Sequence, residues 1–339
     1  MESVNIKKLA QLLGLSIATV SKALRDSYDI SKETKEKVVN LARELNYQPN
    51  PHASSLRRHS SKTIAVIIPE IANNYFTLVI DGIESVVQEK GYHVMIYLTH
   101  EDVSREIAFA RHLHNGRVDG ALISVSGNSN DFSHFRELKA KGLPMVFFDR
   151  VVEDFDTIKV TTDDFESAYL ATHHLIEKGC QRIAHLGISK NLSIGKKRLN
   201  GYLKALADHD MSADDALIAA CTNDNAKDAE LIRNLFVHHK VDGIFASVER
   251  YAILTYEVCR SLNLNIPDDV KVISFSNLQT ASLLNPSLST ITQPAFDMGK
   301  EAVTMLLKAL EKKHFQLKDE NIVIKSSLTQ RESTMLRTK

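Results

Sequence analysis

The chain has 339 residues, 43% of them hydrophobic and 25% charged, and its formal net charge at pH 7 is zero. This composition is ordinary for a soluble globular protein, and the length predicts two or three domains. The N-terminus has no basic-then-apolar leader, and no apolar run is long enough to cross a bilayer, so we expect a cytoplasmic protein without a membrane partner. Three scattered cysteines, Cys180, Cys221 and Cys259, are typical of a reduced compartment.

The zero net charge conceals a difference between two parts of the chain. Residues 1–61 carry ten lysines and arginines against six acidic side chains, a net charge of +4, which leaves −4 for the rest. A basic segment joined to an acidic body favours a polyanionic partner for that segment alone.

The first residues predict a helix-turn-helix. Apolar side chains between Ile6 and Leu13 follow i, i+3, i+4, i+7 spacing, which indicates one short helix. Gly14 suits its C-terminal turn, and Ser16 is a good N-cap for a second helix that buries Val20. Two short helices joined by a Gly-containing turn form this motif, with a plain structural hairpin as the alternative.

The outward side of the second helix carries small, hydroxyl-bearing and basic groups that fit a DNA major groove. Ile17 and Ala18 can contact thymine methyl groups, and Lys22 can reach guanine O6 and N7. The hydroxyl groups of Thr19 and Ser21 can bond phosphates. We therefore predict double-stranded DNA as a partner.

A third helix and a short linker follow. Ser31 can cap the third helix, and Asn46 suits the left-handed position that ends it. Asn50 and Pro51 can begin a helix of only about two turns, which would need a partner to be stable. Leu56, beside two arginines, is a candidate wedge into a minor groove, with an ordinary flexible linker as the alternative.

These segments resemble the headpiece and hinge of the lactose-repressor (LacI/GalR) family of bacterial transcription regulators, and the resemblance continues along nearly the whole chain. The segments that carry it are Ile6-Lys7-Lys8-Leu9-Ala10, Gly14-Leu15-Ser16, Ala18-Thr19-Val20-Ser21-Lys22-Ala23-Leu24, Asn46-Tyr47-Gln48-Pro49-Asn50 and Ala53-Ser54-Ser55-Leu56.

The resemblance implies a homodimer that reads bases with Ile17, Ala18 and Lys22 and opens the centre of a palindromic operator with Leu56. Arg25 stands where the family usually has Asn, so the phosphate contact there can differ. The predicted DNA-binding residues are Ser16, Ile17, Ala18, Thr19, Ser21, Lys22, Arg25, Tyr47, Asn50, Ala53, Ser54 and Leu56.

From Lys62 onward, β-rich runs alternate with helical patterns, which predicts open, mostly parallel sheets with helices on both faces. The expected strands are 64–68, 92–98, 120–125 and 145–148, and the expected helices are 76–90, 103–115 and 131–141.

Two phrases recur in the second half of the chain. The segment Arg117–Ser124 resembles Lys240–Ser247. In addition, Gly82 follows Ile64-Ala65 at the same interval at which Gly201 follows Ile183-Ala184. The repetition favours two lobes of one architecture over chance reuse of short α/β phrases.

The expected fold is an all-α helix-turn-helix headpiece followed by an α/β body of two doubly wound parallel-sheet lobes. The resemblance implies that this body is like a periplasmic binding protein and serves effector binding and dimerisation. The predicted domains are the headpiece at 1–48, a hinge helix at 49–61 and the body at 62–339, with lobe 1 at about 62–161 and 292–322 and lobe 2 at about 162–290 and 323–339.

Two such lobes leave a crevice at the carboxyl ends of their strands, which is the usual ligand site in open α/β sheets. Arg198 lies in a phrase that matches the family, where this arginine commonly contacts effector. For any single residue predicted to bind effector, a charge at the rim of the crevice or an aromatic side chain packed in the core is an equally good interpretation. The predicted effector-binding residues are Tyr75, Phe76, Ser124, Arg150, Arg198, Glu249, Ser276 and Gln293.

Two positions depart from the family pattern. Val248-Glu249 stands where the family has an Asn-Asp pair. After a later strand, Ser276-Asn277 stands where the family has an Asp whose carboxylate accepts hydrogen bonds from sugar hydroxyl groups. Losing a carboxylate removes an acceptor. We expect a carbohydrate-related effector unlike the family's simplest sugars or one held by fewer charged contacts; a body that binds no small molecule is the other alternative.

The chain has no phosphate-loop, Gly-x-Ser-x-Gly or His-Glu-x-x-His motif, and its pairs His173-His174 and His238-His239 lack metal-ligand spacing. We therefore expect that the protein is not an enzyme and that it binds no cofactor and no metal ion. The predicted function is a sequence-specific DNA-binding repressor modulated by a small molecule. The alternative is a small-molecule carrier or sensor without a role on DNA.

Overall fold

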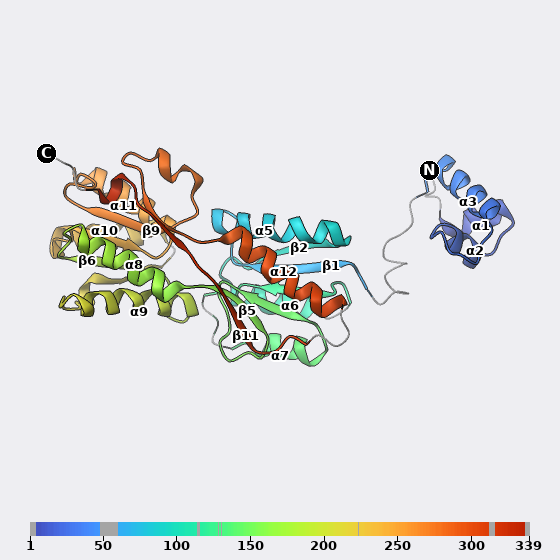
Figure 1. Cartoon of the computed structure of the whole chain (residues 1–339), viewed down its shortest axis with the longest axis horizontal. Coiled ribbons are helices and arrows are strands. Elements are labelled where there is room, and N and C mark those ends of the chain that lie inside the picture. Colours follow the sequence, from blue (N-terminus) through green and yellow to red (C-terminus); the bar gives the residue numbers. More distant parts are fainter. Residues whose placement is uncertain are drawn as a thin grey trace. The chain divides into compact units, whose positions relative to one another are not determined.

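The computed structural model describes residues 5–47, 60–113, 116–127, 129, 131–222, 224–311 and 316–335. The chain forms two compact units, Met1–Ser61 and Lys62–Lys339 (Figure 1).

The first unit contains the three predicted helices, α1 (Ile6–Leu13), α2 (Ile17–Ala23) and α3 (Lys32–Glu44). The predicted caps are confirmed. Gly14 and Asn46 both adopt left-handed backbone, with φ of 63° and 51°. The Ser16 hydroxyl accepts a hydrogen bond from a backbone N–H at the start of α2, and Ser31 does the same for α3. A small core joins the helices, and its buried members are Leu9, Ala10, Val20, Ala23, Val38 and Ala42.

The second unit contains two six-stranded sheets, each between helices. We name them lobe 1, whose strand order is β11-β5-β4-β3-β1-β2, and lobe 2, whose order is β12-β10-β9-β8-β6-β7. Neighbouring strands are parallel except β12, which runs antiparallel to β10. The prediction of two mostly parallel-sheet lobes is confirmed.

In lobe 1, α5 and α12 cover one face of the sheet, and α6 and α7 cover the other (Figure 1). The strands of lobe 1 are β1 (Thr63–Ile68), β2 (His93–Leu98), β3 (Gly120–Ile123), β4 (Met145–Phe148), β5 (Ile158–Thr162) and β11 (Glu320–Ile324). Its helices are α5 (Asn74–Val87), η1 (Gln88–Lys90), α6 (Val103–Leu113), α7 (Ser133–Ala140) and α12 (Ala295–Glu311).

In lobe 2, α8 and α9 pack on one face and α10 and α11 on the other. The strands of lobe 2 are β6 (Ile183–Gly187), β7 (Ile218–Ala220), β8 (Gly243–Ala246), β9 (Lys271–Phe275), β10 (Ser289–Thr292) and β12 (Ser327–Thr329). Its helices are α8 (Asp164–Glu177), α9 (Ser193–Asp208), η2 (Asp215–Leu217), α10 (Asn225–His239), α11 (Glu249–Ser261), η3 (Gln279–Leu283) and η4 (Glu332–Thr334).

The bounds of several elements differ from those expected. The helix expected at 76–90 begins at Asn74, because the side chain of Asn73 accepts a hydrogen bond from the Tyr75 N–H and caps it earlier. The strand expected to reach residue 125 ends at Ile123, because its pairing with β1 and β4 ends there. The crossings between sheets follow Thr162, Thr292 and Ile324, up to two residues later than the approximate lobe bounds expected from the sequence.

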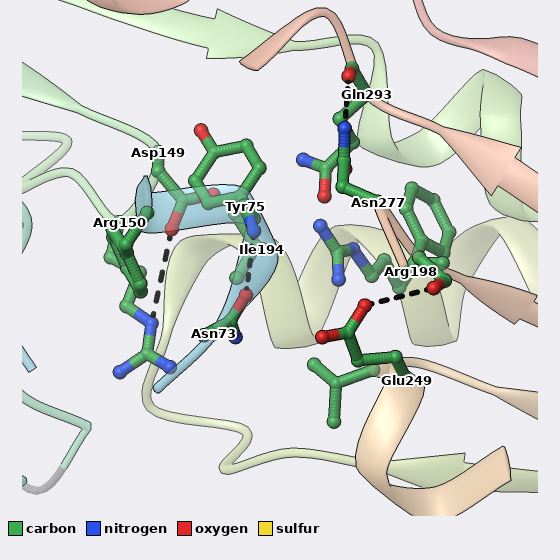
Figure 2. Close-up of a pocket in the computed structure, with 13 residues that line it drawn as sticks. Asn73, Tyr75, Asp149, Arg150, Ile194, Arg198, Glu249, Asn277 and Gln293 are labelled. Carbon is green, nitrogen blue, oxygen red and sulfur yellow. Dashed lines mark hydrogen bonds and ion pairs between the residues drawn. The ribbon is translucent and has the colours of Figure 1, made fainter. Parts of the chain in front are cut away.

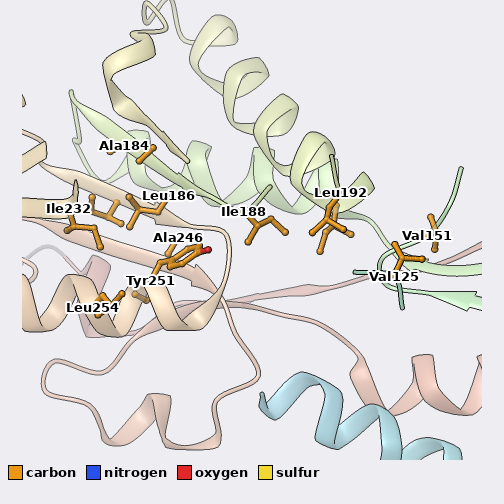
Figure 3. Packing of buried hydrophobic residues seen from close by; sticks show 14 of the residues in the cluster. Val125, Val151, Ala184, Leu186, Ile188, Leu192, Ile232, Ala246, Tyr251 and Leu254 are labelled. Atoms are coloured by element: carbon orange, nitrogen blue, oxygen red, sulfur yellow. The ribbon is translucent and has the colours of Figure 1, made fainter. Parts of the chain in front are cut away.

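The lobes are not separate hydrophobic bodies. One cluster of buried side chains runs from the interior of lobe 1 through Val125 and Val151 to Leu192 and Ile188 in lobe 2 (Figure 3). Burying apolar surface across the junction favours close approach of the lobes.

The repeated glycines have a packing role. A Cβ atom on Gly82 in α5 would lie 2.1 Å from the carbonyl oxygen of Phe296 in α12, and one on Gly201 in α9 would lie 2.3 Å from that of Phe165 in α8. In each lobe the helix after the first strand therefore crosses a neighbouring helix at backbone contact. Gly299 completes the α5–α12 crossing, since its Cβ would lie 2.1 Å from the carbonyl oxygen of Val79.

We expect Gly299→Ala to lower the free energy of unfolding by about 1–3 kcal/mol, because the added methyl group meets backbone that cannot rotate away. Lys300→Ala, at the exposed neighbouring position of α12, is the matched control and should be nearly neutral. Thermal unfolding followed by circular dichroism measures both, and equal melting temperatures for the two variants would contradict this packing.

Candidate functional site

The outward side of α2 is exposed as predicted. Ile17 is 41% exposed, and Ala18, Lys22 and Arg25 are exposed beside it. The Ser16 and Thr19 hydroxyl oxygens lie 2.8 Å apart, so these groups also hold the start of the helix.

Two basic groups on this side have partners within the headpiece. Lys22 forms an ion pair with Asp29, and the Arg25 Nε donates to the Ser21 carbonyl at 2.9 Å. Tyr47 is half-buried against the headpiece core. The other predicted DNA-binding residues, Asn50, Ala53, Ser54 and Leu56, lie outside the described residues.

A pocket lies where the two lobes meet, at the carboxyl ends of their strands (Figure 2). It contains about 390 Å³ of space, part of it open to solvent. Lobe 1 contributes the start of α5 and the end of β4, and lobe 2 contributes α9, the start of α11 and the end of β9. The lining residues are Asn73, Tyr75, Phe76, Asp149, Arg150, Ile194, Arg198, Val248, Glu249, Phe275, Ser276, Asn277 and Gln293.

The structure brings together seven of the eight residues predicted for effector binding. The exception is Ser124, which is fully buried and does not line the pocket. Its hydroxyl lies close enough to Asp149 to favour the charged form of that carboxyl group. Ser124 therefore belongs to the support beneath the pocket, because its position at the end of β3 directs the side chain inward.

Arg198 is the most enclosed charged group of the pocket, with 2% of its side chain exposed. Its Nε donates to Asp164 Oδ1 at 2.8 Å, and its Nη1 donates to the Ser247 carbonyl at 2.5 Å. The guanidinium carbon lies 3.8 Å from the centre of the Phe275 ring. Three elements of lobe 2 thus fix this arginine, and Asp164 balances its charge.

Arg150 is held from a different direction. Its Nη1 donates to Glu101 Oε1 at 2.6 Å, and its Nε lies 4.0 Å from Asp149 Oδ2. Glu101 also accepts a hydrogen bond from the Gly127 N–H at 2.7 Å. His100 and Glu101 both adopt left-handed backbone, with φ of 52° and 60°, a conformation that costs a non-glycine residue about 1–2 kcal/mol.

Asp149 occupies the floor of the pocket between the two arginines, and it is 5% exposed. Burial raises its pKa from 3.8 to about 6, although Arg150 and Arg198 act in the opposite direction. Burial, with Asp149 as its neighbour, also raises the pKa of the Tyr75 hydroxyl well above 10. Near neutral pH Asp149 is therefore largely a carboxylate that can accept hydrogen bonds, whereas the Tyr75 hydroxyl stays protonated and donates to Met298 Sδ at 3.1 Å.

Contacts across the pocket join the lobes directly. Asn74 Nδ2 of lobe 1 donates to Glu249 Oε1 of lobe 2 at 3.2 Å, and within lobe 2 the Ser276 hydroxyl donates to the other oxygen of this carboxylate, Glu249 Oε2, at 2.8 Å. At the crossing strand, Gln293 Nε2 donates to the Thr162 hydroxyl at 3.2 Å. Asn277 Nδ2 in turn donates to the Gln293 carbonyl at 2.7 Å.

Three residues that line the pocket, Asn73, Ile194 and Phe275, were not among the predicted effector-binding residues. Neither were the supporting residues Glu101 and Asp164. Asn73 had a detectable signal as an N-cap candidate. The other positions depend on how distant loops meet, for which the local sequence carries no signal.

The described residues contain no group of three His, Cys, Asp or Glu side chains placed to hold a metal ion. None of the described helices combines the length and hydrophobicity that crossing a bilayer requires. The three cysteines are free, and burial raises the pKa of each thiol to about 12.

Two α/β lobes around a polar pocket, preceded in the chain by a helix-turn-helix, are the arrangement of a DNA-binding regulator. Residues 5–50 match the family model "Bacterial regulatory proteins, lacI family". Residues 61–332 match the model "Periplasmic binding proteins and sugar binding domain of LacI family". The chain therefore belongs to the LacI family, which confirms the resemblance, and members of this family are DNA-binding transcriptional regulators rather than enzymes.

Individual relatives match the chain over nine-tenths or more of their length. A ribose operon repressor of Halalkalibacterium halodurans is 32% identical over 310 residues, 91% of each chain. The transcriptional regulator RegA of Clostridium saccharobutylicum is 31% identical over 335 residues, 98% of this chain and all of the other. A lac repressor dimer bound to operator and an anti-inducer has the same fold, with a TM-score of 0.85 at 21% identity, covering 99% of this chain and 100% of that one.

A solved LacI-family regulator of Enterococcus faecium with bound ribose has a TM-score of 0.71 at 26% identity, covering 80% of this chain and 98% of that one.

The raised pKa of Asp149 makes stability depend on pH. Because folded Asp149 holds its proton up to about pH 6 and the unfolded chain releases it near 3.8, this group lowers the free energy of unfolding as pH rises through that range. The loss is at most about 3 kcal/mol. Asp149→Asn should remove this loss. The free energy of unfolding of the variant, relative to that of the parent protein, should therefore be higher at pH 7.5 than at pH 5.

Urea unfolding of both proteins at the two pH values measures the difference. Asp154→Asn, an exposed substitution of the same type, serves as the control. A stability difference between Asp149→Asn and the parent that does not change with pH would mean that Asp149 titrates normally.

Proposed function

We propose that the protein is a homodimeric transcriptional repressor that binds a palindromic operator and responds to a small molecule in the pocket between its lobes. The observation that carries the proposal is that one pocket is lined by both lobes, while a separate unit contains a helix-turn-helix with the outward side of α2 exposed. A ligand that contacts both lobes in such a pocket can change the arrangement of lobe 1 relative to lobe 2.

The proposal includes the domain roles expected from the sequence, with a headpiece at 1–48, a hinge at 49–61 and an effector-binding and dimerising body at 62–339. A regulator of chromosomal genes acts in the cytoplasm, which is the location we propose. The relatives support an effector related to carbohydrates, since one is named a ribose operon repressor and another was solved with bound ribose.

The cross-lobe contacts indicate how a ligand could act. The Asn74–Glu249 hydrogen bond and the bond from the Val151 N–H to the Ser193 hydroxyl, at 3.3 Å, both join lobe 1 to lobe 2. A ligand that binds one lobe arrangement more tightly than another shifts the population toward it. The hinges of a dimer then favour or disfavour the spacing that an operator requires.

On DNA, Lys22 would exchange its ion pair with Asp29 for the O6 and N7 atoms of a guanine. Both partners are substantially exposed, with 48% and 36% of their side chains accessible. Surface ion pairs of this kind contribute at most about 1 kcal/mol, so the exchange costs little. We propose that Asp29 keeps Lys22 oriented in the free protein.

We expect Lys22→Ala to weaken binding to the operator more than binding to random DNA, by about 1–3 kcal/mol of lost discrimination. A gel-shift series at fixed salt, with an operator selected from a random pool, measures this. Lys37→Ala removes an equal charge from α3 and should leave the ratio of specific to random affinity unchanged. An equal loss on all sequences for Lys22→Ala would make this residue a phosphate contact instead.

The hinge role rests on Leu56, which lies outside the described residues, and on the family to which the chain belongs. We expect Leu56→Ala to weaken specific operator binding at least tenfold, because a methyl group cannot hold a base step open. Random-DNA affinity should change little, since phosphate contacts supply it. Specific affinity equal to that of the parent protein would remove the wedge from the proposed mechanism.

A further inference from the structure

The charged groups of the pocket differ in how their charge is balanced. Arg198 forms its ion pair with Asp164 at 2.8 Å. Arg150 forms one with Glu101 at 2.6 Å and lies 4.0 Å from Asp149. Both guanidinium groups that face the pocket are therefore already matched by carboxylates.

This balance makes the pocket a poor site for an anion. Four carboxyl groups, those of Glu101, Asp149, Asp164 and Glu249, stand in or directly behind its wall, against two guanidinium groups. Glu70 adds a further negative charge near Arg150, and Lys197 adds a positive one near Asp164. A phosphate or carboxylate entering the pocket would have to displace a carboxylate from an arginine or lie unpaired beside one.

Glu249 is the exception among these groups. Its carboxylate is half-buried and lines the pocket, yet it forms no ion pair with any residue that the structure describes. Its two hydrogen-bond donors, Asn74 and Ser276, are neutral. A carboxylate has about four acceptor positions, so about two remain for a ligand.

The position of Glu249 also allows a purely structural role. It is the first residue of α11, where a negative charge interacts favourably with the helix dipole by about 0.3–1 kcal/mol. That interaction needs no group in the pocket. The helix-dipole interaction does not need the hydrogen bond between Glu249 and Asn74 of the other lobe either. That hydrogen bond directs the Glu249 carboxylate toward the space between the lobes (Figure 2).

We propose that the effector carries a protonated amine beside its hydroxyl groups, and that Glu249 is the residue that selects it. An ammonium group would supply the counter-ion that Glu249 lacks, and the paired arginines and Asp149 would bind neighbouring hydroxyl groups. This inference rests on the proposed effector function of the pocket. It names an amino sugar or similar amino-polyol as the ligand class and excludes sugar phosphates and uronic acids.

The test uses the full-length protein and matched sugar triads. Each triad consists of a neutral hexose, its 2-amino-2-deoxy derivative and its uronic acid, in the gluco and galacto series, and binding is measured by calorimetry near neutral pH. In at least one series the amino sugar should bind about tenfold more tightly than the neutral sugar, and the uronic acid should bind most weakly. Raising the pH above the pKa of the amine should abolish the preference.

Glu249→Gln keeps the size and an acceptor oxygen but removes the charge. It should reduce the preference for amine over neutral sugar to near unity while the neutral sugar still binds. Glu153→Gln, an exposed change of the same type outside this pocket, should retain the full preference.

If some sugars bind but in neither series the amino sugar binds more tightly than its neutral and acidic counterparts, the inference is overturned and the proposed effector function stays intact. Preservation of the amine preference in Glu249→Gln would assign that residue only to the helix start and would also overturn it. The absence of binding by every member contradicts both the inference and a carbohydrate-related effector. Operator binding measured on the same preparation then shows whether the DNA-binding role stands independently.

Discussion

The burial of the Arg198–Asp164 ion pair is the interaction on which the geometry of the pocket depends. Both side chains are nearly inaccessible, at 2% and 1% exposure, and the arginine also bonds the Ser247 carbonyl and stacks on Phe275. Loss of one partner from such a pair typically costs 3–5 kcal/mol, because an uncompensated charge remains inside the protein. The starts of α8 and α9 and the ends of β8 and β9 are therefore held in one arrangement.

The surroundings of this ion pair follow from its charge. His185 lies next to Arg198 with both ring nitrogens buried, and burial together with that positive charge lowers its pKa to about 3. The histidine is consequently neutral at any physiological pH. Asp149, on the lobe 1 side, keeps a raised pKa despite two arginines, because burial outweighs their attraction. The junction between the lobes thus combines a buried ion pair in lobe 2 with a titratable group in lobe 1.

Much of the fold could be predicted because its signals are local. Gly14, Ser16, Ser31 and Asn46 end or begin helices through their own backbone preferences and side-chain hydrogen bonds. The interval that Gly82 and Gly201 share predicted two related lobes, and the structure adds the reason, which is close helix crossing at both positions.

The candidate site was predicted less completely. Strand ends indicate where a pocket forms, and seven of eight chosen residues line it. The eighth, Ser124, points into the interior, and the sequence does not reveal on which side of a strand end a buried serine faces. Glu101 and Asp164 escaped prediction because their importance arises from arginines that are 49 and 34 residues away in the chain.

In the proposed mechanism, a ligand in the pocket and DNA at the headpiece affect each other through the arrangement of the lobes. Thermodynamic linkage tests this directly. If the ligand changes the affinity of the protein for the operator by some factor, the operator must change the affinity of the protein for the ligand by the same factor. The measurement is the Kd for operator with and without saturating ligand, and the Kd for ligand with and without operator, on one preparation. The proposed mechanism predicts two equal factors that differ clearly from one; a ligand that binds equally well to free and operator-bound protein would contradict it.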